Sequence, residues 1–470
     1  MLIAIAMAIF LGTIDGSIVN VALPTLVDEF DTTFALTQWV VLAYMLTQAT
    51  LTLGFGRLGD MVGKKPIFTT GFVVFTTGSV LAGLSPTIGW LIAARVVQAV
   101  GAAMIFALGF AITTEAFPPT ERGRALGING TMVSLGIMAG PIVGGLIIEA
   151  TDWRWIFFVN LPIGIIGTIT AVRFIPNTKP RGGQRFDFAG AVAFFFGLLG
   201  FLLGLTLGQE AGFTAPAVLG LLGVSIISFV AFVAIEHRVD QPMLDLTLFR
   251  RQDLTVNLVT GFVAFFAISG LLLLAPFYLT DVVGLSPSEI GLVLGAIPIT
   301  MGIIAPLSGS LSDRIGTRSV TVTGLAIMTA GYVLAAGLLD GVALLGIIVV
   351  GLIIGLGMGV FQSPNNSAIL GSVPPERLGV TSGVLAINRM TGTVTGIAVL
   401  GTLWAARTVA YAGGGTAADA PAPAQAAGLS DAMVLAALLL AAALVLGIWA
   451  WRRERRNLQA GTVTADRSGR

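Results

Sequence analysis

The chain has 470 residues, of which 55% are apolar and only 10% are charged, whereas an ordinary soluble domain has about 25% charged residues. The 25 Lys and Arg residues nearly balance the 24 Asp and Glu residues, so the sequence lacks the positive charge typical of a nucleic-acid-binding protein. The absence of Cys and the single His237 exclude disulfides, metal clusters of thiolates or histidines and a cysteine nucleophile, and the composition fits only an all-α integral membrane protein.

Apolar runs divide the chain into predicted membrane spans. A bilayer core about 30 Å thick requires about 20 apolar residues per helix. The first run has no short apolar core followed by a cleavage site, so we expect a span there and not a signal peptide. The predicted spans are the fourteen ranges 2–23, 38–56, 66–84, 88–115, 124–148, 155–175, 188–207, 215–235, 255–279, 289–311, 319–339, 342–366, 379–403 and 431–451.

The basic residues predict how these spans are oriented. Lys and Arg accumulate on the cytoplasmic side of a membrane protein. If Met1 is cytoplasmic, 21 of the 25 basic residues fall in inner loops or in the C-terminal tail. Arg154 and Arg407 fall outside, and Arg95 and Arg389 fall within spans. We therefore expect an even number of spans, both termini in the cytoplasm and no large loop domain.

Two sequence patterns occur twice. Residues 56–65 (GRLGDMVGKK) return as residues 309–318 (GSLSDRIGTR) at an offset of 253. Residues 117–123 (FPPTERG) return as residues 373–379 (VPPERLG) at an offset of 255 or 256. A tight turn explains one copy, but two copies in register indicate parallel repeats of six helices. In transporters with such repeats the binding site lies between the halves, and one half rocks against the other.

The duplication predicts a pseudo-twofold bundle of six plus six helices with two inserted helices. The predicted units are an N-terminal six-helix bundle over 1–175, cytoplasmic linkers with two inserted helices over 176–253, five helices of a C-terminal bundle over 254–407, a flexible outer loop over 408–430, the last helix over 431–451 and a basic cytoplasmic tail over 452–470.

Two charges lie deep within predicted spans. At 1.5 Å per residue, Asp15 lies about 20 Å from the inner face and Arg95 about 10 Å below the outer face. In a core about 30 Å thick these depths coincide, which predicts a facing pair. Charges within a membrane are costly and usually mark functional sites. Desolvation favours a protonated carboxyl and a nearby guanidinium favours an ionised one, so a carboxyl held between the two effects can exchange a proton.

We expect Asp15 to exchange a proton for a cationic compound. Arg95 would tune this exchange, and Gln98, three residues later on the same helix face, could relay a hydrogen bond. The alternative is a static Asp15–Arg95 ion pair that only locks two helices together. The repeat favours the functional interpretation, because the equivalent positions of the second half hold the uncharged Ile268 and Gly351.

Two further charged residues are candidates. Arg389 lies near the middle of the thirteenth span, where it could neutralise an anionic substrate, pair with an acid in one conformation or reach the interface. Glu115 ends the fourth span near the inner face, where it is either a solvated residue or a proton exit group.

Aromatic, Met and Gln side chains supply candidates for a substrate cavity. An aromatic face attracts a cation by about 0.5–2 kcal/mol, and Met packs adaptably. The alternative for each residue is ordinary contact with lipid or with the core. The candidates are Trp39, Tyr44, Gln48, Met132, Phe265, Phe266, Phe361 and Gln362.

Five segments resemble signatures of the major facilitator superfamily, and in particular its fourteen-helix drug:proton antiporter branch. Residues 56–65 resemble the signature loop after the second helix, and residues 91–101 (LIAARVVQAVG) resemble the fourth-helix signature, with Ala99 where Gly is usual. Residues 136–145 (GIMAGPIVGG) resemble the antiporter signature of the fifth helix. The other two segments are Asp15 with residues 18–24 (IVNVALP) and residues 153–157 (WRWIF) with 160–164 (NLPIG).

The resemblance implies conformational roles for two of these segments. It implies that Asp60 latches the cytoplasmic ends of the halves at the N-terminus of the thirteenth helix, near Gly379, with Arg57 and Arg124 as partners. Met61 departs from the family because a basic residue usually stands there, whereas the second copy keeps its charges at Asp313 and Arg314.

The fifth-helix signature suggests a helix that packs closely yet bends. Small residues at helical spacing allow two backbones to approach, and proline removes one helical hydrogen bond. The resemblance associates this pattern with exporters, which need a sealed but bendable interface; ordinary tight packing is the alternative. Its residues are Gly136, Gly140, Pro141, Gly144 and Gly145.

Together these features predict a proton-coupled antiporter, monomeric and without a cofactor, that exports amphipathic and cationic compounds across the inner membrane by alternating access. An exporter of a specific metabolite, lipid or organic anion is the alternative, with Arg389 as the anion-binding residue. We expect no enzymatic activity, because the sequence has no His-rich or Asp-rich loop.

Overall fold

The computed structural model describes six segments of the chain. They are residues 1–116, 119–177, 187–240, 252–338, 344–372 and 378–468. Some side chains within the helices are also not described. The predictions for Arg57, Asp60, Glu115, Arg124 and Asp313 therefore lie outside the described residues.

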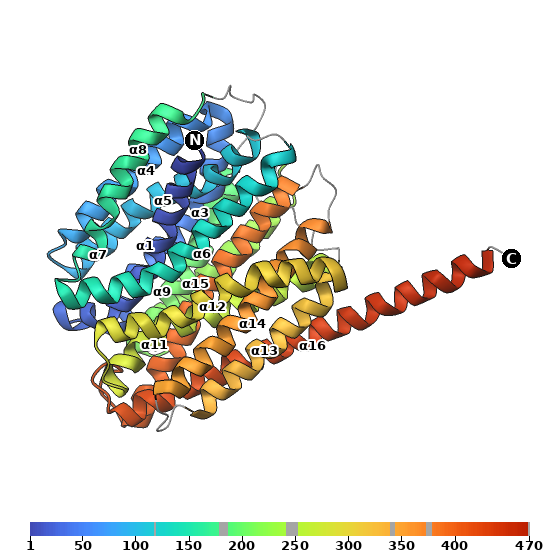
Figure 1. The fold of residues 1–470 in the computed structure, drawn as a ribbon. Helices are drawn as coiled ribbons and strands as arrows, with labels where there is room; N and C mark the ends of the chain where they lie inside the picture. Colours follow the sequence, from blue (N-terminus) through green and yellow to red (C-terminus); the bar gives the residue numbers. More distant parts are fainter. Residues whose placement is uncertain (117–118, 178–186, 241–251, 339–343, 373–377, 469–470) are drawn as a thin grey trace.

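The described residues form helices and short connections and contain no strand. Figure 1 shows the first helices as one group, in blue to cyan, beside a second group in yellow to red. The N-terminal half comprises α1 (Leu2–Glu29), α2 (Phe34–Thr37), α3 (Trp39–Val62), α4 (Lys64–Gly83), α5 (Ile88–Ala116), α6 (Pro119–Ala150), α7 (Trp155–Phe158) and α8 (Asn160–Phe174). The C-terminal half comprises α11 (Gln252–Phe277), the π-helix η2 (Tyr278–Val282), α12 (Pro287–Ile315), α13 (Thr317–Leu338), α14 (Leu344–Gly371), α15 (Leu378–Ala412) and α16 (Ala422–Ser468).

A helix lies over each of the fourteen predicted spans. Thirteen helices of the described residues are long and apolar enough to cross a bilayer. The exception is α6, whose described apolar stretch, Leu135–Ala150, is shorter than a span. The multi-pass membrane architecture is thus confirmed, whereas the count of fourteen spans is not. Below, the Met1 end of the bundle is the end where α1 begins, and the Asp28 end is the end where α1 finishes.

The two halves repeat one packing scheme. In the N-terminal half α1 packs on α6, α3 on α5 and α4 on α5. In the C-terminal half α11 packs on α15, α12 on α14 and α13 on α14, which are the same pairs one repeat later. The agreement extends to single residues, because Gly136 and Gly140 of α6 meet α1 and Gly392 and Gly396 of α15 meet α11. The predicted six-plus-six architecture is therefore present.

The inserted helices α9 (Phe188–Ala211) and α10 (Pro216–Glu236) pack on each other as a hairpin. The turn between them requires Gly212, whose φ of 82° lies in the left-handed region that favours glycine. α9 also packs on α3 and α15, so the insert lies beside a contact between the two halves. Because α10 has large apolar residues exposed along much of its length, this hairpin presents an apolar surface to the surroundings.

The predicted outer loop at 408–430 and the last helix at 431–451 require correction. α15 continues to Ala412 and α16 begins at Ala422, so the connection is much shorter than predicted. It also packs closely. The buried side-chain amide of Gln425 donates to the Ala420 carbonyl at 3.0 Å, and the backbone carbonyl of Gln425 accepts from the Trp404 indole at 3.3 Å. Alanine is the strongest helix former, which explains why this Ala-rich stretch extends the helices.

Candidate functional site

Four helices of the N-terminal half bring five polar side chains to one buried point. Asp15 lies in the middle of α1, and Arg95 and Gln98 lie one turn apart on α5. Ser79 comes from α4 and Asn160 from the first position of α8. All five side chains are almost completely inaccessible to solvent, with exposed fractions of 0–1%. We refer to Asp15, Ser79, Arg95, Gln98 and Asn160 as the buried polar network.

Three donors satisfy the Asp15 carboxylate. Arg95 donates from Nη1 to Oδ2 at 2.6 Å. Gln98 and Asn160 donate to the other oxygen, Oδ1, at 2.7 and 2.9 Å. Ser79 Oγ accepts from the same two amides at 2.6 and 3.2 Å. These distances are those of good hydrogen bonds, and bonds to an ionised group are the strongest kind.

Arg95 is held from several sides. Its Nη1 also donates to Gln98 Oε1 at 2.6 Å, and its Nε donates to the Val40 carbonyl of α3 at 3.2 Å. Its guanidinium carbon lies 4.0 Å from the centre of the Tyr44 ring, a cation–π distance. The arginine therefore joins α1, α3 and α5.

The network has a clear energetic consequence. A buried charge without its partner costs about 3–5 kcal/mol. In this conformation the Asp15 carboxylate is paired with Arg95, hydrogen-bonded and closed to water. Removing either charge would leave the other one buried without its partner.

The depth argument from sequence correctly predicted that Asp15 and Arg95 face each other, and Gln98 joins them. Sequence reasoning missed the parts played by Ser79 and Asn160. Asn160 is a polar residue within the segment NLPIG that resembles a family signature, and this was the available signal. Ser79 gave no such signal, because a single serine in an apolar helix often bonds only its own backbone.

Tyr44 was predicted to line a substrate cavity, but its side chain is buried with an exposed fraction of 1%. Its hydroxyl has no hydrogen-bond partner among the described residues, and its ring lies against Arg95. We therefore expect Tyr44→Phe to retain transport and to have an equal or higher melting temperature, because the substitution removes an unsatisfied buried hydroxyl.

Tyr44→Leu, which removes the ring, should lower both stability and transport. Melting temperature and transport rate measured for the two variants would test this assignment. A large loss of transport in Tyr44→Phe alone, with stability unchanged, would instead indicate that the hydroxyl contacts substrate or a proton.

The other predicted cavity residues lie on several helices. The Trp39 indole donates to Thr206 of α9 at 3.1 Å and so holds the inserted hairpin. Phe361 is completely buried where α14 packs on α13 near Gly324, and Phe266 is buried where α11 packs on α15 near Gly396.

The remaining candidates have mixed surroundings. Gln48 is buried, while Met132, Phe265, Gln362 and Arg389 are half-buried and Arg314 is exposed at the Met1 end of α12. Among the described residues no hydrogen bond or ion pair involves the Arg389 side chain, so its charge is available to a ligand or to a second conformation. Its role stays a prediction.

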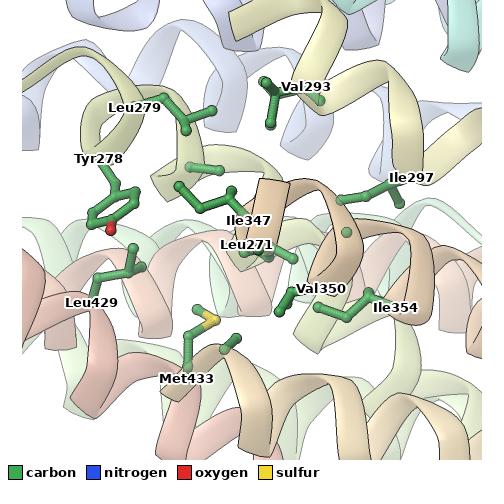
Figure 2. Close-up of a pocket in the computed structure, with 15 residues that line it drawn as sticks. Leu271, Tyr278, Leu279, Val293, Ile297, Ile347, Val350, Ile354, Leu429 and Met433 are labelled. Carbon is green, nitrogen blue, oxygen red and sulfur yellow. The ribbon is translucent and has the colours of Figure 1, made fainter. Parts of the chain in front are cut away.

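The C-terminal half contains an apolar cavity of about 70 Å³ (Figure 2). Its walls come from α11, η2, α12, α13, α14 and α16, and no charged side chain lines it. Figure 2 shows Ile297, Val350 and Ile354 on one side and Tyr278, Leu429 and Met433 on the other. None of the predicted substrate residues lies in this wall.

Part of this cavity wall corresponds by the repeat to the part of the N-terminal half that holds Arg95 and Gln98. The offset of 253 places Ile297 opposite Tyr44, and the offset of 256 places Gly351 and Ile354 opposite Arg95 and Gln98. The packing supports this alignment, since Gly78 of α4 lies against Gln98 and Gly331 of α13 lies against Ile354. Because Gly351 replaces an arginine, space remains where the N-terminal half holds a guanidinium.

The glycine-rich segment of α6 contacts two helices. An added Cβ on Gly136 or Gly140 would overlap Thr13 or Ser17 of α1, and Ser17 Oγ donates to the Gly136 carbonyl at 3.1 Å. The neighbouring face contacts α12 of the other half, where Gly145 lies against Pro287. On this same face Gly291 of α12 lies against the Pro141 carbonyl. One segment therefore joins the helix that carries Asp15 to the interface between the halves.

Contacts between the halves close the Asp28 end. The ring of Phe34 in α2 packs edge-on against Phe277 of α11 and Trp404 of α15, with centroids 5.0 and 4.7 Å apart. Glu149, near the end of α6, accepts from the Ser288 backbone N–H at the start of α12 at 3.0 Å. A carboxylate is favoured at a helix N-terminus, so this contact stabilises the closed Asp28 end.

The model of the Major Facilitator Superfamily matches residues 5–397 and also 258–465. Among curated proteins, riboflavin transporter RibZ of Clostridioides difficile (strain 630) is 38% identical over 86% of this chain and 88% of that protein. Multidrug resistance protein Stp of Mycobacterium tuberculosis is 33% identical over 86% of this chain and 75% of that protein. Multidrug transporter protein MdtP of Bacillus subtilis (strain 168) is 30% identical over 85% of this chain and 74% of that protein.

Solved structures show the same fold at lower identity. A bacterial homologue of the human lysosomal transporter Spinster, in an inward-facing and unoccupied conformation, superposes with a TM-score of 0.68 at 20% identity, covering 96% of each chain. The human organic anion transporter MFSD10 gives a TM-score of 0.62 at 16% identity, over 93% of this chain and 98% of that one.

Proposed function

The chain belongs to the major facilitator superfamily, and we propose that it is a proton-coupled antiporter that exports amphipathic, cationic compounds across the cell membrane by alternating access. The observation that carries this proposal is the buried polar network, in which one membrane-embedded acid, Asp15, is held by Arg95, Gln98 and Asn160. The multidrug transporters among its relatives support a broad range of substrates.

In the proposed cycle, Asp15 takes up a proton from outside and releases it to the cytoplasm as cargo leaves. The network supports a coupled step because α1 carries Asp15 and also packs on the glycines of α6, whose other face meets α12. Movement at Asp15 can therefore reach the interface between the halves. We assign the Met1 end to the cytoplasm because the Lys and Arg residues concentrate there.

Two carboxylates at helix N-termini are proposed to act in opposite phases of this cycle. The Glu149 contact with α12 stabilises closure at the Asp28 end and must break when that end opens. Asp60 would make the corresponding contact with α15 at the Met1 end, as the family resemblance implies. Asp60 lies outside the described side chains, so that contact is an expectation only.

Export of a specific metabolite or organic anion is the second candidate. Two observations favour it: the riboflavin transporter RibZ is 38% identical to this chain, and the half-buried Arg389 has no acid partner among the described residues. A neutral aromatic or anionic substrate would suit an uncompensated guanidinium better than a cation would.

Transport in inverted membrane vesicles tests the two candidates. After a proton gradient is established, with the vesicle lumen acidic, we expect quaternary ammonium compounds and cationic dyes to dissipate the gradient, because each cation that enters the lumen is exchanged for a proton that leaves it. Vesicles that contain the Asp15→Asn variant at equal protein level are the matched control. Dissipation by riboflavin or organic anions, without a response across the cation panel, would favour the specific exporter. No response to either set, with folded protein, would contradict proton antiport.

A further inference from the structure

The apolar span of α16, Ala422–Arg456, finishes in a cluster of four arginines after two tryptophans, in the sequence WAWRRERR over residues 449–456, and the helix continues beyond it. Arg452, Arg453, Arg455 and Arg456 are all exposed. No salt bridge between described side chains involves them. Among the described residues this positive charge has no ion-pair partner, and it lies where the apolar span of α16 finishes, at a level where lipid headgroups supply negative charge.

Glu454, the single acid among these arginines, bonds to the helix bundle. Arg318, from the first turn of α13, donates to Glu454 at 2.8 Å and to Asp253 of α11 at 2.6 Å. Glu454 therefore ties α16 to two neighbouring helices through Arg318. With four arginines and one acid, the cluster keeps a net positive charge.

Helical geometry separates these two functions. At 100° per residue, Arg452, Arg453 and Arg456 fall within an arc of about 100°, and Glu454 lies about 150° from the centre of that arc. We call these three residues the arginine face. Trp449 lies one turn earlier within the same arc and is half exposed, and the Arg453 guanidinium carbon is 5.7 Å from a Trp449 ring centre.

The apolar surface of α16 leads directly to the arginine face. Val434, Leu438 and Val445 are exposed by 43%, 63% and 65%, and the helical period places them on the same side as Trp449. Exposed aliphatic side chains along a spanning helix face acyl chains, and tryptophan concentrates at the level of the headgroups. The next turn, which holds the arginines, therefore lies at the depth of the lipid phosphates.

We propose that Trp449, Arg452, Arg453 and Arg456 form a binding site for an anionic phospholipid of the leaflet at the Met1 end. Guanidinium groups bind phosphate oxygens with paired N–H donors, so the arginine face would bind the phosphodiester and the anionic headgroup. The Trp449 ring would lie beside the glycerol region, and the aliphatic stripe would contact one acyl chain. This site is separate from the buried polar network and does not depend on the substrate.

Lipid retention measured by native mass spectrometry tests the proposal on the full chain. The protein would be released from nanodiscs of equal parts phosphatidylcholine and phosphatidylglycerol, and bound phosphatidylglycerol would be counted. Each basic residue near an anionic surface contributes roughly a fivefold gain in affinity, so Arg452→Gln/Arg453→Gln/Arg456→Gln should bind phosphatidylglycerol about 100-fold more weakly than the original chain.

The matched control removes three positive charges elsewhere at the same end of the bundle. Lys65→Gln/Arg173→Gln/Arg238→Gln should retain phosphatidylglycerol as the original chain does. Equal retention by the arginine-face variant, or an equal loss in the control, would overturn the proposal. Circular dichroism and size-exclusion chromatography of both variants would verify folding. Because the readout is binding and not transport, failure here leaves the proposed antiport untouched.

Discussion

Asp15→Asn is expected to abolish proton-coupled transport, to below about one tenth of the original rate. Asparagine cannot carry a proton through the cycle, and its amide would present a donor to Arg95, Gln98 and Asn160, which are donors themselves. The measurement is the substrate-dependent loss of a proton gradient in inverted vesicles. Asp152→Asn is the matched control, because the carboxylate of this partly exposed acid bonds only to Arg154 among the described residues.

Loss of activity alone would not separate a proton carrier from a structural ion pair. Asp15→Asn leaves Arg95 buried without its partner, which costs about 3–5 kcal/mol and lowers the melting temperature. The double variant Asp15→Asn/Arg95→Gln removes the uncompensated charge and should recover most of that stability. Transport should stay absent if Asp15 carries the proton. Recovery of transport in the double variant would show that the pair only locks α1 to α5.

Gly140→Ala is expected to reduce both stability and transport. The added Cβ would overlap Ser17 Oγ and would lie 2.8 Å from Ser17 Cβ and 2.9 Å from the Ile18 backbone N. Overpacking of this kind costs about 1–3 kcal/mol. Because Ser17 is two residues from Asp15 on α1, a displacement there also disturbs the buried polar network. We expect a transport rate at least about tenfold lower.

Gly16→Ala is the matched control for this substitution. Gly16 also lies within a helix, on α1 itself, but nothing lies within 4 Å of the position of an added Cβ. It should gain up to about 1 kcal/mol from helix propensity and keep its transport rate. Melting temperature and transport measured on both variants distinguish close packing from a general effect of alanine. Equal behaviour of the two variants would contradict the role given to the α1–α6 contact.

The position of the Asp15–Arg95 pair followed from simple counting, because a bilayer fixes the depth of a residue by its distance from the helix end. The same counting did not identify Ser79 or Asn160, whose depth says nothing about which helix face they occupy. The aromatic candidates for a substrate cavity came from residue type alone, and their role stays a prediction. In this conformation Phe361 is buried between α13 and α14, and Trp39 donates a hydrogen bond to α9.

The apolar cavity in Figure 2 illustrates how repeats diverge. The sequence indicated that Gly351 replaces an arginine at the equivalent position. That the exchange leaves an apolar space, bordered by η2 and α16, required the packing of six elements at once. The predicted loop at 408–430 failed for a related reason, because composition alone could not reveal the contacts of Gln425 and Trp404 that stabilise the ends of α15 and α16.

The sequence by itself determined the membrane architecture, the duplication, the location of the basic end and the two charges at matching depth. These follow from hydrophobicity and from helical rise, which act along one chain segment at a time. The tertiary structure alone decided which donors satisfy Asp15, how α6 connects α1 to α12 and which face of α16 carries the exposed arginines. Those features depend on the rotation of each helix about its own axis, and only the packing of all neighbouring helices fixes that rotation.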